Sequence, residues 1–254
     1  MYPASQPELI IALSRDKVTL NLSGLKEQDR KYWKTSFSMD GIFLNEQISR
    51  SLDQVLFEND FLVEHIPCVE IILVDRPHIS VPRYYADNGQ LPDIASRYLR
   101  LRMGDTLTSD DTQTGSVFCY TIPANTLQML KEYYANIQVI HLASVLWQAL
   151  ADERASVDGK LICYTILQDT LIAFASKNNK LVFSKTFHLR SEADLSYYSL
   201  ACSRLVHPDE NWLITIDKEE STYDISAGSS LHISRHITLP SIHLLVDQFK
   251  KCGS

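Results

Sequence analysis

Two short groups of side chains are of types that bind metal ions, His232 with His236 and Asp110 with Asp111. We expect both histidines on one strand, where a spacing of four residues separates them by about 13 Å. Zinc binds its ligands at about 2 Å, so this pair cannot share one ion. The acidic pair lies in a predicted polar, mobile loop from Gly104 to Gly115, without the further glycine and carboxylate of a calcium loop. We interpret the histidines as ordinary surface or half-buried residues and the two acids as solvated.

The spacing of the glycines excludes several common catalytic motifs. The chain has eight glycines, and no two are closer than 11 residues. A phosphate-binding G-x-x-x-x-G-K loop, a dinucleotide-binding G-x-G-x-x-G turn and a G-x-S-x-G nucleophile elbow all require closer glycines. The sequence therefore contains none of these three motifs.

The five cysteines indicate neither a disulfide framework nor a paired-thiol metal site, because their number is odd and no two lie within four residues. We predict small buried side chains in a protein of a reducing compartment. The N-terminal segment lacks the basic start of a secretory signal. The longest charge-free apolar span, Asn136 to Ala151, is about 16 residues, short of the roughly 20 needed to cross a bilayer. We expect a cytoplasmic protein without direct membrane insertion.

Composition limits the size of the core and the kind of partner. With 254 residues and 45% hydrophobic content, the chain can bury one large core or two modest ones. The formal net charge of −7 argues against a surface that attracts phosphate backbones or anionic lipid. Nucleic acid is therefore not an expected partner.

One pattern of apolar and polar runs occurs twice in the chain. In Glu8–Met39 and again in Leu161–Leu189, two apolar runs flank a polar pair, Arg15-Asp16 or Gln168-Asp169, and a third run follows a polar turn. This pattern predicts a three-stranded meander in each segment. The aspartates of the two pairs lie 153 residues apart, which indicates two similar lobes.

The remaining segments predict alternating helices and strands. Apolar spacing indicates an amphipathic helix of about 15 residues from Phe43 onward and another from Glu192 to Leu205. Further helices are expected at 92–102, 123–134, 141–153 and after Pro240, and further strands at 68–74, 116–122, 137–140, 212–216 and 230–237. We expect an Asn178-Asn179 hairpin turn inside the second meander.

Three tyrosine pairs stand out among the aromatic residues. We expect each pair to have one buried ring and one surface ring. Surface rings beside the predicted mobile loop from Gly104 to Gly115 and its surrounding segment, about 78–135, are a candidate binding site for a partner protein. The pairs are Tyr84-Tyr85, Tyr133-Tyr134 and Tyr197-Tyr198.

The repeated β-β-β-α-β order resembles the duplicated ribonuclease-H-like fold of the actin-like ATPase superfamily. The segments IQVIHLASVLWQAL and KLICYTILQDTLIAFASKNNKLVFSKTF resemble the crossover helix and second-lobe start of its type IV pilus assembly and type II secretion scaffold proteins. The chain is also similar to a family of uncharacterised bacterial proteins, a domain of unknown function with this fold. The expected fold class is α/β, with a first lobe at 1–155, an inserted subdomain at about 78–135 and a second lobe at 156–254.

The resemblance also implies where a nucleotide would bind. An actin-like ATPase holds phosphates in the first hairpin turn of each lobe, usually with Asp-x-Gly, because glycine lets backbone N–H groups approach the phosphates. The corresponding hairpins here carry Ser14, Asp16, Asp169 and Thr170 and contain no glycine. We expect degenerate nucleotide-binding loops, with no cofactor, in a pseudo-ATPase. The alternative is a divergent ATPase that binds ATP with Mg²⁺ through these four residues, with the two aspartates facing each other across the cleft.

A nuclease is a further alternative, because Glu46 and Asp75 stand roughly where ribonuclease-H-like nucleases place two metal carboxylates. A two-metal site needs another acid in the first strand, and Leu9–Leu13 supplies none. The favoured function is therefore a non-catalytic actin-like scaffold or interaction module with a protein partner and possible self-association.

Overall fold

The computed structural model describes residues 8–14, 17–23, 33–38, 44–64, 66, 68–99, 101–217, 223, 232–242 and 244–246. The chain divides into two compact units. Unit 1 comprises Met1–Arg76, Leu101–Thr108 and Thr121–His141, and unit 2 comprises Pro77–Arg100, Ser109–Tyr120 and Leu142–Ser254. The expected lobe boundary between residues 155 and 156 stays a prediction, because compactness does not test it.

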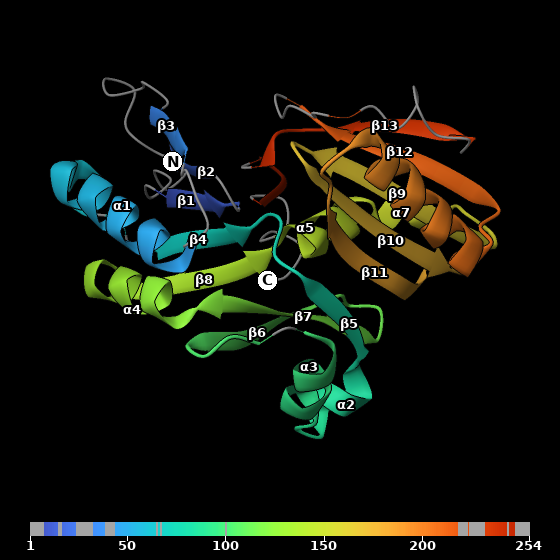
Figure 1. The fold of residues 1–254 in the computed structure, drawn as a ribbon, viewed down its shortest axis with the longest axis horizontal. Helices are drawn as coiled ribbons and strands as arrows, with labels where there is room; N and C mark the ends of the chain where they lie inside the picture. The colour runs from blue at the N-terminus through green and yellow to red at the C-terminus, as the bar shows by residue number, and fades with distance from the viewer. Residues whose placement is uncertain are drawn as a thin grey trace, which may run out of the picture. The chain divides into compact units, whose positions relative to one another are not determined.

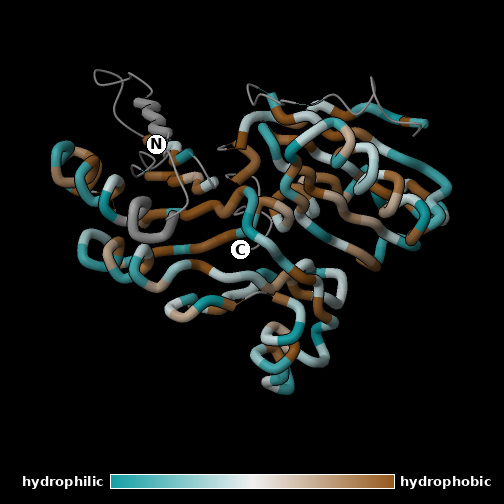
Figure 2. Tube along the Cα trace, in the orientation of Figure 1, coloured by the Kyte–Doolittle hydropathy of each residue, from teal (hydrophilic) through white to brown (hydrophobic). Residues whose placement is uncertain are grey.

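Unit 1 contains a five-stranded sheet with the order β3-β2-β1-β4-β8 (Figure 1). β1 to β3 form an antiparallel meander, and β4 and β8 continue the sheet parallel to β1. β1 and β4 are apolar along most of their length, which suits central strands covered on both faces (Figure 2). The strands are β1 (Glu8–Leu13), β2 (Lys17–Ser23), β3 (Trp33–Ser38), β4 (Cys68–Leu73) and β8 (Asn136–His141).

Helices α1 (Leu44–Glu58) and α4 (Ala124–Tyr133) pack against each other in unit 1 (Figure 1). A short 3-10 helix, η2 (Asp60–Leu62), follows α1. The Tyr133 hydroxyl donates a 2.6 Å hydrogen bond to Asp53 of α1, and this bond raises the pKa of Tyr133 to about 12. The amphipathic helix predicted from Phe43 onward is confirmed, although Phe43 itself lies outside the described residues.

Unit 2 contains a second five-stranded sheet with the order β11-β10-β9-β12-β13, which matches the first sheet strand for strand. The meander is again antiparallel, and the two added strands are again parallel to its first strand. The duplicated fold predicted from the repeated meander is therefore confirmed. The strands are β9 (Lys160–Leu167), β10 (Thr170–Lys177), β11 (Lys180–His188), β12 (Glu210–Ile216) and β13 (Arg235–Leu239).

Helix α7 (Glu192–Val206) packs on one face of this second sheet and contributes Leu195 and Cys202 to its core. Ser191 caps its N-terminus by accepting a bond from the Asp194 amide, which satisfies one of the unpaired donors of the first turn. Cys119, Cys163 and Cys202 are buried free thiols, so the expectation of buried cysteines is confirmed for these three. Cys68 is half-buried, so the expectation is wrong for this residue, and Cys252 lies outside the described residues.

The Asn178-Asn179 turn joins β10 to β11 as predicted, with both residues at positive φ (50° and 60°). Asn tolerates this conformation better than most residues, and it suits the twist of a tight hairpin. The side-chain oxygen of Asn179 also accepts a 2.6 Å hydrogen bond from Arg154. The turn is thus tied to the segment that precedes β9.

Arg154 is buried among polar and aromatic partners. Its guanidinium lies 3.3 Å from the centre of the Trp147 ring and donates a 2.7 Å bond to the Trp147 carbonyl. Burial lowers the pKa of Arg154 to about 10. Trp147 belongs to α5 (Leu142–Ala149), and Arg154 belongs to a separate helix, α6 (Ala151–Ala155). The single helix predicted over 141–153 is therefore interrupted at Leu150.

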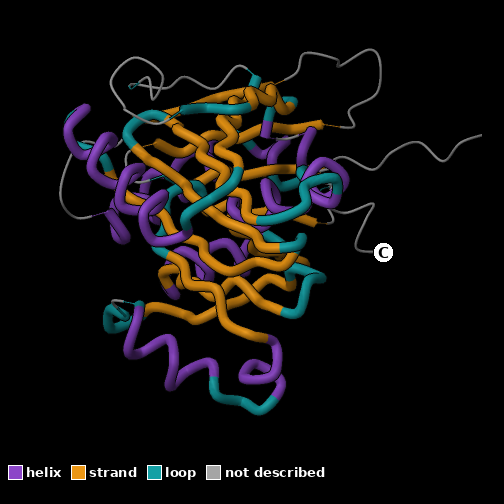
Figure 3. Tube along the Cα trace, turned by 90° about the vertical axis from the view of Figure 1, so that its right-hand side faces the viewer, coloured by secondary structure: helices purple, strands orange, loops and turns teal. Residues whose placement is uncertain are grey.

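The third sheet has the order β5-β7-β6, and helices α2 and α3 follow β5 along the chain. In Figure 3 these two helices are the purple segments at the bottom of the view. The predicted helix at 92–102 is present as α3 but ends at Tyr98. The bounds are β5 (His78–Pro82), α2 (Arg83–Asp87), α3 (Leu91–Tyr98), β6 (Asp105–Asp111) and β7 (Ser116–Pro123).

The predicted mobile loop from Gly104 to Gly115 is wrong, because most of it is the strand β6. Asp110 is 9% exposed, and its carboxylate accepts hydrogen bonds from the hydroxyls of Tyr120 (2.6 Å) and Ser144 (2.5 Å). These bonds offset the cost of burying a charge. The sequence alone does not reveal the two hydroxyl partners. Asp110 is therefore a structural residue and not a solvated one.

The last strand, predicted at 230–237, begins later than expected. β13 begins at Arg235, residues 232–234 are not in a strand, and residues 230 and 231 lie outside the described residues. Residues 242 and 244–246 are helical, as expected after Pro240. Among the described residues, no helix has the length and apolar character needed to cross a bilayer.

Candidate functional site

The β9–β10 hairpin is the second of the two turns in which an actin-like ATPase would hold phosphates. Leu167 pairs with Thr170, so only Gln168 and Asp169 form the turn. Gln168 has a positive φ of 51°, a conformation that glycine adopts at lower cost. The turn is therefore tight, and a side chain stands where a phosphate loop has glycine.

Asp169 is engaged by its own neighbours. One carboxylate oxygen lies 3.1 Å from Nδ1 of His188, and the other accepts a 3.3 Å hydrogen bond from the Thr170 hydroxyl. The Asp169 carbonyl accepts a 2.6 Å bond from the amide of Leu189. Thr170 is 3% exposed. The two predicted site residues of unit 2 thus lie side by side, and both contribute to closing the hairpin.

The equivalent turn of unit 1 is described only in part. Both the amide and the hydroxyl of Ser14 donate 2.9 Å hydrogen bonds to the Lys17 carbonyl. Asp16, the other predicted site residue of this turn, lies outside the described residues, as does Arg15. The nucleotide-binding role of these residues therefore stays a prediction.

The structure describes three of the four residues His232, His236, Asp75 and Glu46 with their side chains. His236 lies in β13, whereas His232 precedes the strand, and both are exposed. Asp75 follows β4 and is half-buried, and the side chain of Glu46 lies outside the described part. Across the residues that can be described, no group of three or more His, Cys, Asp or Glu side chains is placed to hold a metal ion.

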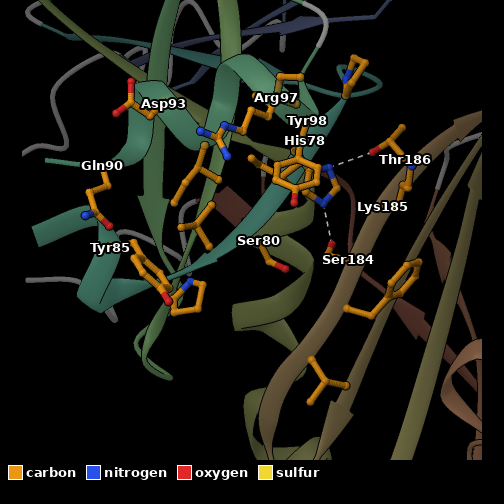
Figure 4. Close-up of a pocket in the computed structure, with 18 residues that line it drawn as sticks. His78, Ser80, Tyr85, Gln90, Asp93, Arg97, Tyr98, Ser184, Lys185 and Thr186 are labelled. Carbon is orange, nitrogen blue, oxygen red and sulfur yellow. Dashed lines mark hydrogen bonds between the residues drawn. The ribbon is translucent and has the colours of Figure 1, made fainter. Parts of the chain in front are cut away.

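A pocket of about 720 Å³ lies within unit 2, between β5, α3 and β11 (Figure 4). This volume falls within the usual range for ligand sites, roughly 300–1,000 Å³. The residues Pro77–Pro82 form one wall, and Val182–Thr186 form another. The remaining lining residues come from the helical segment after β5 and are Tyr85, Gln90, Asp93, Ile94, Arg97, Tyr98 and Leu99.

His78 joins two walls of this pocket at one end. Its Nδ1 lies 3.0 Å from the Thr186 hydroxyl and its Nε2 lies 2.5 Å from the Ser184 hydroxyl (Figure 4). The ring also meets Phe118 of β7 edge-to-face, with 5.3 Å between ring centres. His78 is only 2% exposed. The contact therefore holds β5 close to β11 through side chains.

Charged and aromatic side chains surround the open part of the pocket. Arg97 of α3 and Lys185 of β11 stand on opposite sides, and Asp93 lies one helical turn before Arg97 (Figure 4). Tyr85 and Tyr98 are exposed by 42% and 74%. Tyr84 is exposed as well, so the expectation of one buried ring is wrong for the first tyrosine pair.

In each of the other two tyrosine pairs one ring is more exposed than the other, but neither pair has both a buried ring and an exposed ring. Tyr134 is buried and Tyr133 half-buried. Tyr197 is exposed, whereas Tyr198 is half-buried and stacks on Phe187 with 4.5 Å between ring centres.

Sequence reasoning did not find this pocket. The segment 77–82 is short and has proline at each end, so its sequence does not predict a strand. One signal was available in the second meander, where Val182, Ser184 and Thr186 alternate with other residues. This alternation places small hydroxyl side chains on one face of β11.

The chain aligns over nearly its whole length with solved structures of the same fold. A Bacteroides thetaiotaomicron protein, described as having an actin-like ATPase fold and unknown function, aligns over 93% of this chain and 91% of its own, with a TM-score of 0.74 and 15% identity. The cytoplasmic domain of EpsL, an inner membrane component of the type II secretion system of Vibrio cholerae, covers 98% of this chain and 95% of its own, with a TM-score of 0.53 and 13% identity.

The PilM–PilN type IV pilus biogenesis complex covers 96% of this chain and 95% of the matched chain, with a TM-score of 0.52 and 11% identity. These similarities show the actin-like ATPase fold and confirm the resemblance inferred from the repeated meander. The family described as "Protein of unknown function (DUF3822)" matches residues 2–211. A search of curated proteins found no match to the sequence.

Proposed function

Because the chain belongs to the DUF3822 family and has an actin-like ATPase fold, we propose that it is a non-catalytic scaffold module that acts by binding other proteins. Fold and activity are separable, so the site must carry the functional inference. The proposed module keeps the fold of the ATPases without their phosphate loops. We place it in the bacterial cytoplasm, where free thiols such as Cys163 and Cys202 stay reduced.

The closed β9–β10 hairpin is the observation that carries this proposal. A phosphate-binding turn needs backbone N–H groups that the ligand can approach and a carboxylate that can hold a hydrated metal ion. Here the Asp169 carboxylate already faces His188 and Thr170, and Gln168 occupies the turn. Nucleotide binding would have to break these contacts and open the turn.

Two relatives by fold support the protein-binding part of the proposal. PilM was solved in a complex with PilN, and EpsL is a component of a secretion system. Both names describe proteins that work within assemblies. A protein partner is therefore the expected ligand for this chain, and self-association is one form that such an assembly could take.

A thermal unfolding titration with ATP and Mg²⁺ tests the non-catalytic part. A ligand present at 100 times its dissociation constant stabilises the native state by about 2.7 kcal/mol, which shifts the melting temperature measurably. We expect no saturable rise at millimolar nucleotide. A saturable rise that is lost in Asp16→Ala and Asp169→Ala, but kept in the exposed control Asp152→Ala, would establish the divergent ATPase instead.

Sedimentation of the purified chain and of complexes isolated from the native cell tests the protein-binding part. We expect a complex of fixed stoichiometry that survives purification. A chain that sediments as a monomer and co-purifies with nothing at stoichiometric amount would contradict the scaffold function.

A further inference from the structure

Two strand edges border the pocket in unit 2. β5 pairs with β7 along one edge, and β11 pairs with β10 along one edge. Each is the terminal strand of its sheet in the described part of the chain. A terminal strand presents main-chain N–H and C=O groups that can pair with another chain.

The way the strands line the pocket shows that their edges open into it. Residues 77–82 and 182–186 line it without a gap. Successive side chains of a strand point to opposite faces, so a pocket above one face would be lined by alternate residues. Lining by consecutive residues places the pocket beside the strand, where the main-chain groups point.

His78 keeps the two edges near each other without a main-chain ladder. Its ring nitrogens contact the hydroxyls of Ser184 and Thr186, and β5 and β11 diverge from this contact (Figure 4). Among the described residues, no backbone hydrogen bond joins 78–82 to 182–186. The space between the diverging strands is the pocket.

The side chains around the edges of β5 and β11 indicate which side chains a bound peptide strand would have. Arg97 and Lys185 line the pocket with one acid, Asp93, on a chain whose net charge is −7. In the described part of the chain, neither cation makes an ion pair within 4.0 Å. Tyr85 and Tyr98 add exposed rings, a residue type enriched at binding hot spots.

We propose that the pocket binds a short extended peptide that adds a strand to the free edge of β11 and places an acidic side chain beside Arg97 and Lys185. Strand addition supplies affinity through main-chain hydrogen bonds, and pockets for alternate side chains supply specificity. The five residues of β5 span about 16 Å, which limits the peptide to four or five residues. The inference rests on the proposed protein-binding function, for which it names the partner's chemistry.

A display selection tests this site with the full chain as bait and a random heptapeptide library as probe. Peptides that also bind Arg97→Glu/Lys185→Glu are removed by counter-selection. We expect enriched sequences with one acidic residue among alternating β-branched or aromatic residues. Enrichment of no sequence over the counter-selected pool would overturn the proposal.

Fluorescence polarisation of the best enriched peptide then tests the binding mode. We expect Arg97→Glu/Lys185→Glu to weaken binding at least tenfold, with an unchanged melting temperature because both side chains are exposed. The charge control Arg204→Glu, on the exposed surface of α7, should bind as the wild type does. Equal weakening by Arg204→Glu would mean nonspecific charge attraction and would overturn the assignment.

N-methylation of the peptide backbone distinguishes strand addition from other modes. Methylating alternate amides should weaken binding at least tenfold in one register and less than threefold in the other, because alternate amides of a strand face the neighbouring strand. Equal effects in both registers, or displacement of the peptide by inorganic phosphate, would overturn strand addition.

The two proposals fail separately. Loss of peptide binding without any nucleotide-induced stabilisation would remove only the β11 site. A saturable nucleotide effect with peptide binding intact would overturn only the non-catalytic function.

Discussion

His141 is fully buried at the end of β8, and its Nε2 lies 2.8 Å from the Arg76 carbonyl, to which it donates. Burial lowers the pKa of His141 to about 4, although the bond to Arg76 opposes this shift. Between pH 6.5 and 4 the unfolded chain therefore binds a proton at this residue and the native protein does not. Stability from this residue is retained above about pH 6.5 and lost as the pH falls toward 4.

We predict that His141→Gln flattens the pH dependence of unfolding. The glutamine amide can donate to the Arg76 carbonyl but does not titrate. We compare the free energy of unfolding at pH 7 and pH 4 by urea denaturation. The loss between these two pH values should be smaller in the variant than in the wild type, by up to about 3 kcal/mol. The exposed control His236→Gln should keep the wild-type slope. An unchanged slope in His141→Gln would show that His141 titrates normally.

Asp110 and Asp111 are adjacent in sequence but differ in burial. Asp110→Ala would leave the buried hydroxyls of Tyr120 and Ser144 without this acceptor. We predict a loss of about 3–5 kcal/mol in the free energy of unfolding, since hydrogen bonds to charged groups contribute about 1.5–3 kcal/mol each. Asp111 forms an exposed ion pair with Arg83, so Asp111→Ala should cost less than about 1 kcal/mol. Equal losses in urea denaturation would refute the structural role of Asp110.

At the scale of elements, the two residues of the β10–β11 turn differ in their contacts. Both have a positive φ, but among the described residues only the side chain of Asn179 bonds to a residue outside the hairpin. Glycine suits the positive φ of both Asn178 and Asn179. Asn178→Gly should therefore be neutral within about 0.5 kcal/mol or slightly stabilising. Asn179→Gly removes the acceptor of buried Arg154 and should destabilise by about 1–2 kcal/mol.

Urea denaturation of a double-mutant cycle checks this cause. In an Arg154→Met background, the cost of Asn179→Gly should disappear, because no buried donor is left without an acceptor. A cost that persists in that background would assign the effect to the turn itself.

Periodicity predicted the elements whose burial follows from their own sequence. β1, β4 and β9 are nearly continuous apolar runs and α1 has an apolar stripe, so the local sequence predicts each of them. β6 was missed because its polar residues are stabilised by partners elsewhere, such as Tyr120 and Ser144 for Asp110. β5 was missed because it has only five residues and pairs with β7, more than 30 residues later.

The sequence predicts that the phosphate-binding turn lacks glycine, but it does not predict the pocket. The lack of glycine in the Gln168-Asp169 turn is visible in the sequence, and the hairpin geometry agrees with it. The pocket brings His78 beside Ser184 and Thr186, which are 106 and 108 residues away. No local pattern specifies a contact over that distance, so only the fold reveals it.

At the scale of the whole molecule, three buried thiols offer a probe of cooperativity in unit 2. Cys119, Cys163 and Cys202 all belong to this unit. Burial raises the pKa of Cys119 and Cys202 to about 11 and raises that of Cys163 as well. Because the thiolate is the reactive form, native thiols should react slowly near neutral pH.

We predict that pulsed alkylation in increasing urea modifies these three cysteines over one shared transition, read by peptide mass spectrometry. A single cooperative unit exposes all its buried groups together. Separate transitions for Cys119 and Cys163 would show that residues 77–100 and 109–120 of unit 2 open independently of the rest of the unit.

The duplicated sheet order ends, in unit 2, with β11 as an edge strand of nine residues. Long edge strands can template the stacking of identical chains into insoluble fibres. β5 lies beside part of this edge, and Pro77, which precedes β5, and Pro82, its last residue, have no N–H to extend a ladder. β5 therefore limits how far pairing can propagate, so the proposed ligand strand can bind at this edge without making the protein prone to amyloid-like growth.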